Sequence, residues 1–135
     1  MSDSFSFEVE MEGDLTHSIE KLTLALKEVG FGVLTRIDVN EVLKTKINAD
    51  FRPYSILGVC NPHLAHRALQ QNAEVGLMLP CPVTIEKKDD NTTLIRVGNP
   101  DVFIQFGDFA NDPVLTQVAA EAKEKLEKAI SALQS

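Results

Sequence analysis

The chain alternates between segments with the two-residue period of a β-strand and segments with the period of an α-helix. Apolar and polar residues alternate over residues 5–11, which is typical of a half-buried strand. Gly13 interrupts this pattern, and Asp14 is a suitable N-cap for a helix. The next apolar residues recur at steps of four and three, which predicts an amphipathic helix that ends before Gly30. They are Leu15, Ile19, Leu22, Leu26 and Val29.

Three Asx-Pro pairs mark further helix starts, because Asn and Asp are good N-caps and proline fits the first helical position. The pairs begin at Asn61, Asn99 and Asp112. We expect the helix after Asn61 to run to about Asn72 and the last helix to cover Pro113–Leu133. Within the first of these helices, the predicted buried face consists of Leu64, Ala65, Ala68 and Leu69.

Four more segments have the composition of strands, namely residues 33–39, 54–60, 82–87 and 93–97, and residues 88–92 are predicted to form a hairpin loop. Asp38 and Glu41 match a capping box that opens a short helix around Val42. These elements predict an α+β fold in which residues 1–135 form one compact domain. Its mixed sheet of about five strands packs with an amphipathic N-terminal helix, a central helix after Cys60 and a long C-terminal helix.

The charge balance argues against partners with negatively charged surfaces. The chain has 13 basic and 20 acidic residues, a formal net charge of −7. A protein of this charge repels phosphate backbones, so we expect no binding to nucleic acid and none to an anionic membrane.

The N-terminal residues have neither the basic nor the apolar region of a signal peptide. The longest nearly apolar stretch, residues 75–80, is much shorter than a membrane-spanning helix. We therefore expect a cytoplasmic protein with no membrane association, in which the two cysteines are free thiols.

Common catalytic motifs are absent from the sequence. It contains no P-loop, no G-x-S-x-G, no H-E-x-x-H and no C-x-x-C pattern. We assign no reaction and no catalytic residue on sequence grounds, and whether the protein is an enzyme stays open.

The two cysteines are the leading candidates for a site. Cys60 precedes Asn61, the predicted N-cap, and a thiol beside a helix N-terminus can have a lowered pKa. The alternative is that Cys60 packs in the core as a small apolar residue. Cys81 lies between two prolines ahead of the next strand. If the strands on either side are neighbours, both sulfur atoms lie at one edge of the sheet, where a disulfide is also conceivable.

Two histidines lie on the helix that follows Cys60. His63 and Arg67 are one turn apart on its polar side, with His66 at the margin. One interpretation is a solvated or interface surface. The other makes His66 a general base, a metal ligand or a haem ligand close to Cys60. A structural zinc site needs four ligands, so the two cysteines require additional ligands from histidine, a carboxylate or a second subunit.

Most of the sequence resembles one family. The runs YSILGVCNP, LAHRAL and VGLMLPC, together with GFGVLT, closely resemble the family called domain of unknown function 302. The resemblance extends over residues 5–133 and implies a compact α+β domain that forms a homodimer. It implies no reaction, because the family has none generally established. The elements Cys60-Asn61-Pro62 and Leu79-Pro80-Cys81 match the family pattern, whereas His63 departs from the proline that is more usual there.

Three functions follow as hypotheses. The first is a homodimer that binds a small molecule, a metal or haem in a cleft near Cys60, His66 and Cys81. The second is a thiol-dependent redox protein in which Cys60 is the reactive thiolate and Cys81 resolves it. The third is an interaction module whose cysteines belong to the core.

Overall fold

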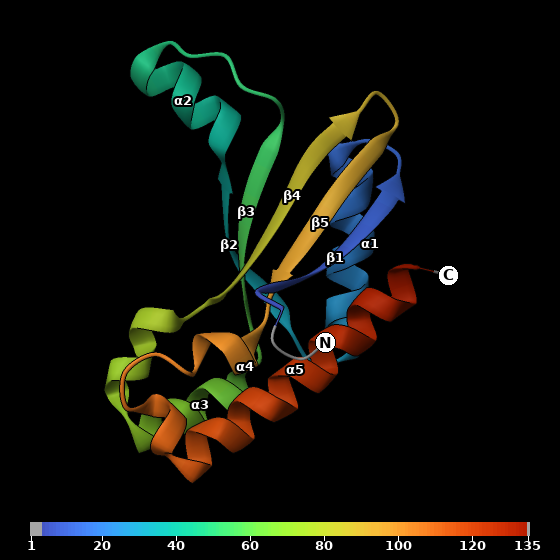
Figure 1. Cartoon of the computed structure of the whole chain (residues 1–135). Helices are drawn as coiled ribbons and strands as arrows, with labels where there is room; N and C mark the ends of the chain where they lie inside the picture. Colours follow the sequence, from blue (N-terminus) through green and yellow to red (C-terminus); the bar gives the residue numbers. More distant parts are fainter. Residues whose placement is uncertain (1–3, 135) are drawn as a thin grey trace.

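The structure is a computed structural model that describes residues 4–134. Residues 1–3, on which the prediction of no signal peptide partly depends, lie outside this range. The described strands form one five-stranded sheet in the order β1-β5-β4-β3-β2 (Figure 1). They are β1 (Ser6–Glu12), β2 (Gly32–Asp38), β3 (Tyr54–Cys60), β4 (Cys81–Asp89) and β5 (Thr92–Gly98).

Helices connect and cover the strands. The α-helices are α1 (Leu15–Glu28), α2 (Val39–Ile47), α3 (Pro62–Gln71), α4 (Pro100–Phe103) and α5 (Pro113–Leu133). Two 3-10 helices are η1 (Ala73–Met78) and η2 (Phe109–Asn111). The predicted α+β class, with its amphipathic first helix, central helix and long last helix, is confirmed.

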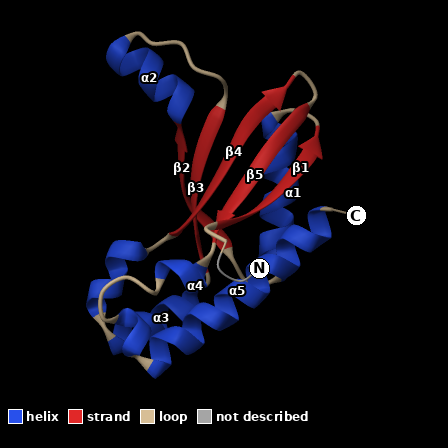
Figure 2. Ribbon diagram, in the orientation of Figure 1, coloured by secondary structure: helices blue, strands red, loops and turns tan. Residues whose placement is uncertain are grey.

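The core lies between the sheet and the pair α1 and α5, which also contact each other. The side chains that fill it come from alternate strand positions and from one stripe on each helix, as the two periodicities predict. Fully buried members include Leu22, Leu26, Leu57, Val83, Ile85, Ile95 and Leu126. Beyond the end of the sheet, α3 and α4 pack on α5, so this end of the molecule is built of helices (Figure 2).

The predicted N-caps are confirmed for most helices. The Asp14 side chain accepts a hydrogen bond from the His17 N–H at the start of α1. The Asn61 side chain does the same for α3 and that of Asp112 for α5. Because these polar groups satisfy amides that the helix itself leaves unpaired, the Asx-Pro pairs fix where the helices begin.

The sheet corrects one prediction, because all pairings among the described strands are antiparallel rather than mixed. A helix between two strands is typical of a parallel crossover. Here α2 and α3 lie beyond opposite ends of the sheet, so the chain reverses direction instead of crossing a face (Figure 1).

Three local predictions are also wrong. The Asp38 side chain makes no capping hydrogen bond to α2 and instead accepts one from the Ser55 hydroxyl on β3. Leu69 is 42% exposed rather than buried. The hairpin loop is shorter than predicted, because β4 extends to Asp89 and β5 begins at Thr92.

The edge formed by β2 and α2 is the least covered part of the fold. No residue of α2 is buried, and β2 is an edge strand. This region nevertheless exposes several large apolar side chains, which we call the β2–α2 surface: Leu34, Ile37, Val42, Ile47 and Phe51.

Within residues 4–134, no helix is both long enough and apolar enough to cross a membrane.

Candidate functional site

The two cysteines meet where the sheet joins the helical end. Val59 pairs with Cys81 in the β3–β4 ladder, so Cys60 is one residue beyond the partner of Cys81. The two strands are therefore neighbours, as the sequence hypothesis required, and both cysteines are free. Both are half-buried, and both line the same cavity.

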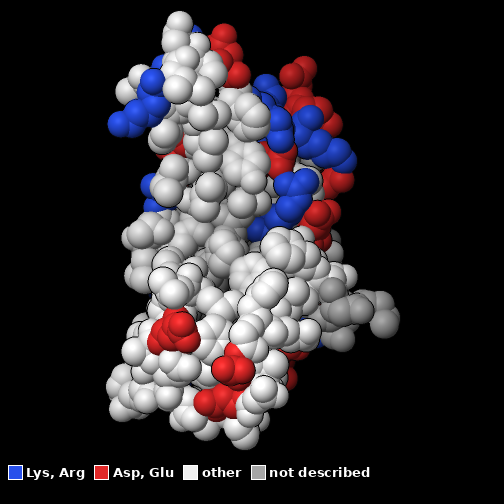
Figure 3. Space-filling view, turned by 60° about the vertical axis from the view of Figure 1, so that its left-hand side comes forward, with Lys and Arg blue, Asp and Glu red and all other residues white. Residues whose placement is uncertain are grey.

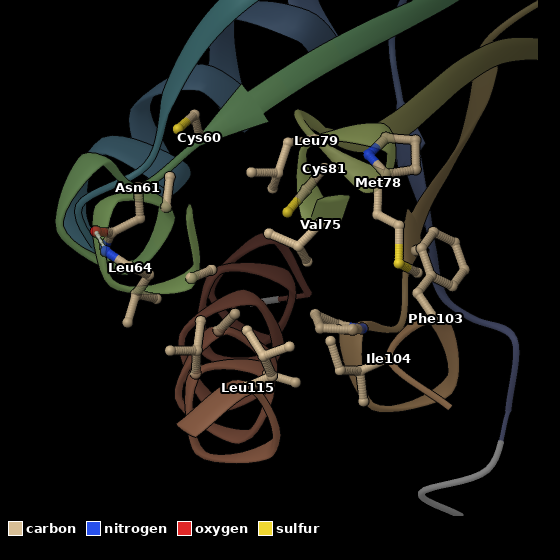
Figure 4. A pocket seen from close by; sticks show the side chains of 18 of the residues that line it. Cys60, Asn61, Leu64, Val75, Met78, Leu79, Cys81, Phe103, Ile104 and Leu115 are labelled. Carbon is tan, nitrogen blue, oxygen red and sulfur yellow. Dashed lines mark hydrogen bonds between the residues drawn. The ribbon is translucent and has the colours of Figure 1, made fainter. Parts of the chain in front are cut away.

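This cavity has a volume of about 80 Å³ and is partly open to solvent. It lies between the end of the sheet, α3, η1, α4 and the first half of α5, and apolar side chains point into it from all of these elements (Figure 4). Its lining consists of Phe31, Cys60, Asn61, Leu64, Ala65, Ala68, Val75, Met78, Leu79, Cys81, Pro82, Gly98, Pro100, Phe103, Ile104, Leu115, Val118, Ala119 and Ala122.

Gly58 on β3 allows the chain to pack closely at the side of the cavity next to Cys81. A Cβ atom at Gly58 would clash with the ring of Pro80 and with the hydroxyl of Thr35. The absence of a side chain therefore lets the segment that enters β4 lie directly against β3. That segment, with its cis Leu79–Pro80 peptide, contributes Leu79 and Cys81 to the lining.

The polar side chain in the lining is already engaged. The Asn61 Oδ1 atom accepts hydrogen bonds from the backbone N–H groups of His63 and Leu64, at 3.1 and 3.2 Å. The N-terminal amides of α3 that could otherwise attract an anion or a thiolate thus have an acceptor within the chain.

Both thiols are protonated at neutral pH. Burial raises the pKa of Cys60 above its ordinary value. Burial, together with the charge of a Cys60 thiolate nearby, raises the pKa of Cys81 to about 11. The lowered pKa considered for Cys60 from its place before α3 is therefore wrong, because burial disfavours the thiolate and the first amides of α3 are bonded to Asn61.

His66 does not accompany the cysteines. It lies on the exposed side of α3 and is not part of the cavity lining, and His63 is also exposed. Arg67 on the same side donates hydrogen bonds to both carboxylate oxygens of Glu121 on α5. This face of α3 is thus a solvated surface with one ion pair, in agreement with the simpler of the two interpretations.

The described residues also lack the arrangement needed for a metal centre. Within residues 4–134, no three side chains of His, Cys, Asp or Glu are grouped so that they could hold a metal ion. The cavity volume of about 80 Å³ is also far too small for a haem.

Sequence reasoning missed the wall opposite the sheet. η1 supplies Val75 and Met78, while α4 and its C-cap supply Phe103 and Ile104. The caps of these short helices were visible as Asn72 and Asn99, whose side chains accept hydrogen bonds from the N–H groups two residues later. No pattern showed that the apolar residues after these caps enclose a cavity, because that depends on long-range packing.

Comparison with known proteins identifies the family. The model of the family described as domain of unknown function DUF302 matches residues 7–133. The chain belongs to the DUF302 family. A solved relative, the uncharacterized conserved DUF302 protein from Bacillus stearothermophilus, is 34% identical and superimposes with a TM-score of 0.83. The match covers 96% of this chain and 98% of that one.

No curated protein matches the chain significantly. Membership of the DUF302 family therefore supports the fold and the common architecture of the site region. The DUF302 name carries no reaction, substrate or ligand, so the chemistry of the site must be argued from its residues.

Proposed function

We propose that this protein binds a small apolar molecule in the cavity between the sheet and the helical end. The observation that carries the proposal is the lining, which is apolar apart from Asn61 and two protonated thiols. Concave apolar sites of this kind are the usual place for small ligands. At about 80 Å³, the cavity is smaller than the ~150 Å³ cavity that accepts benzene, so a short alkyl chain fits it best.

Affinity is expected to be modest. Each buried methylene group contributes about 0.8 kcal/mol, so a six-carbon alcohol that places about half of its chain in the cavity should have a Kd on the order of ten millimolar. The test is a titration of isotopically labelled protein with 1-hexanol, followed by NMR. Shifts confined to amides around the cavity, such as those of Val75 and Leu115, would support the proposal.

A matched pair of substitutions distinguishes the cavity from general surface binding. Ala119 is buried and lines the cavity, whereas Ala120 is exposed on the same helix. Ala119→Leu should abolish hexanol binding, and Ala120→Leu should leave it unchanged. The larger side chain of A119L enters existing space. We therefore expect its free energy of unfolding to stay close to that of the native protein, without the ~1–3 kcal/mol loss that overpacking causes.

The outcome that contradicts the proposal is also defined. Equal hexanol binding by the native protein and A119L, or no binding by either, would exclude the cavity as the ligand site. If A119L fails to fold, Ala65→Leu at the half-buried rim of the cavity serves the same purpose.

The thiol-redox alternative has the proximity of the two cysteines in its favour but lacks the reactive thiolate that it requires. Its reactive cysteine required a low pKa, and burial raises the pKa of both thiols. We therefore do not propose it as a second function.

We also propose that the protein acts as a homodimer through the β2–α2 surface. Ile47 is 69% exposed and Leu34 is 65% exposed, although both are large apolar residues. Because α2 buries none of its own residues, a second copy of the same surface would cover side chains that the single chain leaves in water.

A further inference from the structure

Two residues of the cavity lining differ from the others in how they relate to the core. Phe31, Leu64 and Leu115 are typical of the large lining residues, because they are buried members of the core cluster. Met78 and Phe103 also line the cavity but are only half-buried. In the part of the chain that the structure describes, neither belongs to the core cluster or packs against it. Changes at these two positions can therefore alter the cavity with less disturbance of the core.

Phe103 is the larger of these two residues and lies at one side of the cavity. It is the last residue of α4, and Met78 is the last residue of η1. In Figure 4 both side chains lie on the same side of the cavity, opposite Cys60 and Asn61. The Phe103 ring therefore limits how far the cavity extends in this direction.

The Phe103 ring packs against the backbone of Gly98 at the end of β5. A Cβ atom added at Gly98 would lie 2.8 Å from Cζ and 3.0 Å from Cε2 of the ring. Carbon atoms in van der Waals contact are normally ~3.5–4.0 Å apart, so the ring occupies the space that a side chain at this position would need. The absence of a side chain at Gly98 therefore lets the ring come close to the sheet.

The N-terminal segment and the start of α4 hold the Phe103 ring as well. The centroid of the Phe5 ring lies 5.2 Å from that of Phe103, in a tilted aromatic pair. The buried Asn99 side chain donates a hydrogen bond to the Ser4 carbonyl oxygen at 2.8 Å and accepts one from the Asp101 N–H at 3.0 Å. Because these bonds fix the segment that carries Phe5 and the first turn of α4, the ring is a preorganised part of the wall.

We propose that Phe103 determines the size of the molecule that the cavity accepts, and that it restricts this molecule to an alkyl chain with about three carbons inside the cavity. The proposal rests on the proposed function, because it concerns the ligand of the same cavity. The ring cannot move aside for a longer chain or for an aromatic molecule without losing its contacts with Gly98 and Phe5. A longer chain therefore leaves its remaining carbons outside.

The test compares 1-butanol, 1-hexanol and benzene, with Kd values obtained from NMR titrations. In the view of Figure 3, the helical end shows acidic groups on a largely uncharged surface, so uncharged probes keep these groups from influencing the comparison. Each methylene group that leaves water for the cavity lowers Kd about fourfold, which corresponds to ~0.8 kcal/mol. In the native protein, hexanol should bind less than about threefold more tightly than butanol, because its two extra methylene groups stay outside. Benzene should not bind.

Variants of Phe103 assign the size limit to this residue. Phe103→Ala removes a phenyl ring, so the variant should bind benzene, and hexanol should bind about 15-fold more tightly than butanol because both extra methylene groups enter the cavity. Phe106→Ala is the control, since Phe106 is 62% exposed and does not line the cavity, and it should keep the native pattern. If Phe103→Ala fails to fold, Phe103→Leu, which keeps an apolar side chain against Gly98, should increase the preference for hexanol about fourfold.

The outcomes separate this proposal from the proposed function. If the native protein binds benzene, or binds hexanol about 15-fold more tightly than butanol, the size limit is overturned and the ligand site stands. If the Phe103 variants bind both alcohols as the native protein does, the limit is not set by Phe103. Failure of both alcohols to bind the native protein would overturn the proposed function, and the size limit with it, whatever benzene does in Phe103→Ala.

Discussion

Cys60 illustrates how a residue's chemistry depends on neighbours that the sequence does not place. Its position before the α3 N-cap was predictable, whereas its proximity to Cys81 depended on a strand pairing that the sequence left open. Its pKa was not predictable, because burial is a property of the assembled fold. Asn61 also uses its side chain to cap the helix, so the free amides that would stabilise a thiolate are occupied.

We predict that both thiols react slowly with iodoacetamide. Because burial keeps them protonated, both thiols should be alkylated more slowly than free cysteine at pH 7.5. When the alkylation rate is plotted against pH, the midpoint of the rise should lie above 9.0 for either residue. Cys81 should be the slower of the two. The rates can be followed by mass spectrometry, with Cys60→Ser to isolate the Cys81 reaction.

This prediction would be contradicted if Cys60 of the native protein reacted fast and the midpoint of its rate against pH lay below 9.0. The denatured protein provides the reference, since both thiols are then solvated and should react at the rate of free cysteine.

At the scale of elements, the sheet is held on its open face by a ladder of ion pairs. The Arg96 side chain on β5 donates hydrogen bonds to Glu8 on β1 and to Glu86 on β4. Glu86 also accepts one from Arg52, which immediately precedes Pro53 and β3, at 2.8 Å. Charged side chains thus connect three strands and the entry to a fourth.

Glu86 is the central member, with a side chain that is only 10% exposed. Burial alone would raise its pKa, but the hydrogen bonds from Arg96 and Arg52 outweigh this effect and leave the pKa below its ordinary value. A carboxyl group whose pKa is lowered by folding stabilises the native state above its unfolded pKa. That stability is lost as the pH falls through the folded value.

We predict that Glu86→Gln lowers the free energy of unfolding by about 2 kcal/mol at pH 7, because two charge-assisted hydrogen bonds are lost. The difference from the native protein should begin to shrink as the pH falls below 4.5, where the carboxyl group of the unfolded chain becomes protonated, and should shrink further as the pH falls through the lower pKa of the folded state. Urea unfolding at pH 7 and at lower pH measures both quantities.

The control is Glu10→Gln on the same sheet. Glu10 pairs with Lys88, and both side chains are about half exposed. Exposed pairs contribute little, so this change should cost less than about 1 kcal/mol. If the two substitutions lowered the free energy of unfolding equally, the ion pairs at Glu86 would contribute no more stability than an exposed pair.

The sequence determines where helices begin more reliably than it determines long-range contacts. Helix starts depend on local capping chemistry, and those at Pro62 and Pro113 were therefore predicted to the residue. The predicted N-cap at Asp38 was wrong because the Ser55 hydroxyl on a neighbouring strand donates a hydrogen bond to the Asp38 carboxylate instead. η1 was missed because a short 3-10 helix has too few residues to establish a period.

At the scale of the whole molecule, the β2–α2 surface predicts self-association. We expect the native protein to be a dimer at micromolar concentrations in sedimentation velocity experiments. Ile47→Asp should raise the dissociation constant about tenfold or more, because it places a charge within the proposed apolar contact. The monomer should stay folded, since Ile47 is 69% exposed in the single chain.

Leu24→Asp is the matched control. Leu24 is 66% exposed on α1, outside the β2–α2 surface, and its replacement should leave the dimer intact. A native protein that sediments as a monomer would refute the homodimer. If both variants dissociated, the dimer interface would not be the β2–α2 surface alone, and the proposed location would be wrong.

The cavity lies at one end of the sheet, and α2, which carries Val42 and Ile47 of the β2–α2 surface, lies beyond the other end (Figure 1). No residue of the β2–α2 surface lines the cavity, whose lining is mostly apolar and includes Phe31 and Phe103. Under the two proposals, substitutions in the lining would change the molecule that the protein holds without altering the dimer contact, so selection can act on each property separately.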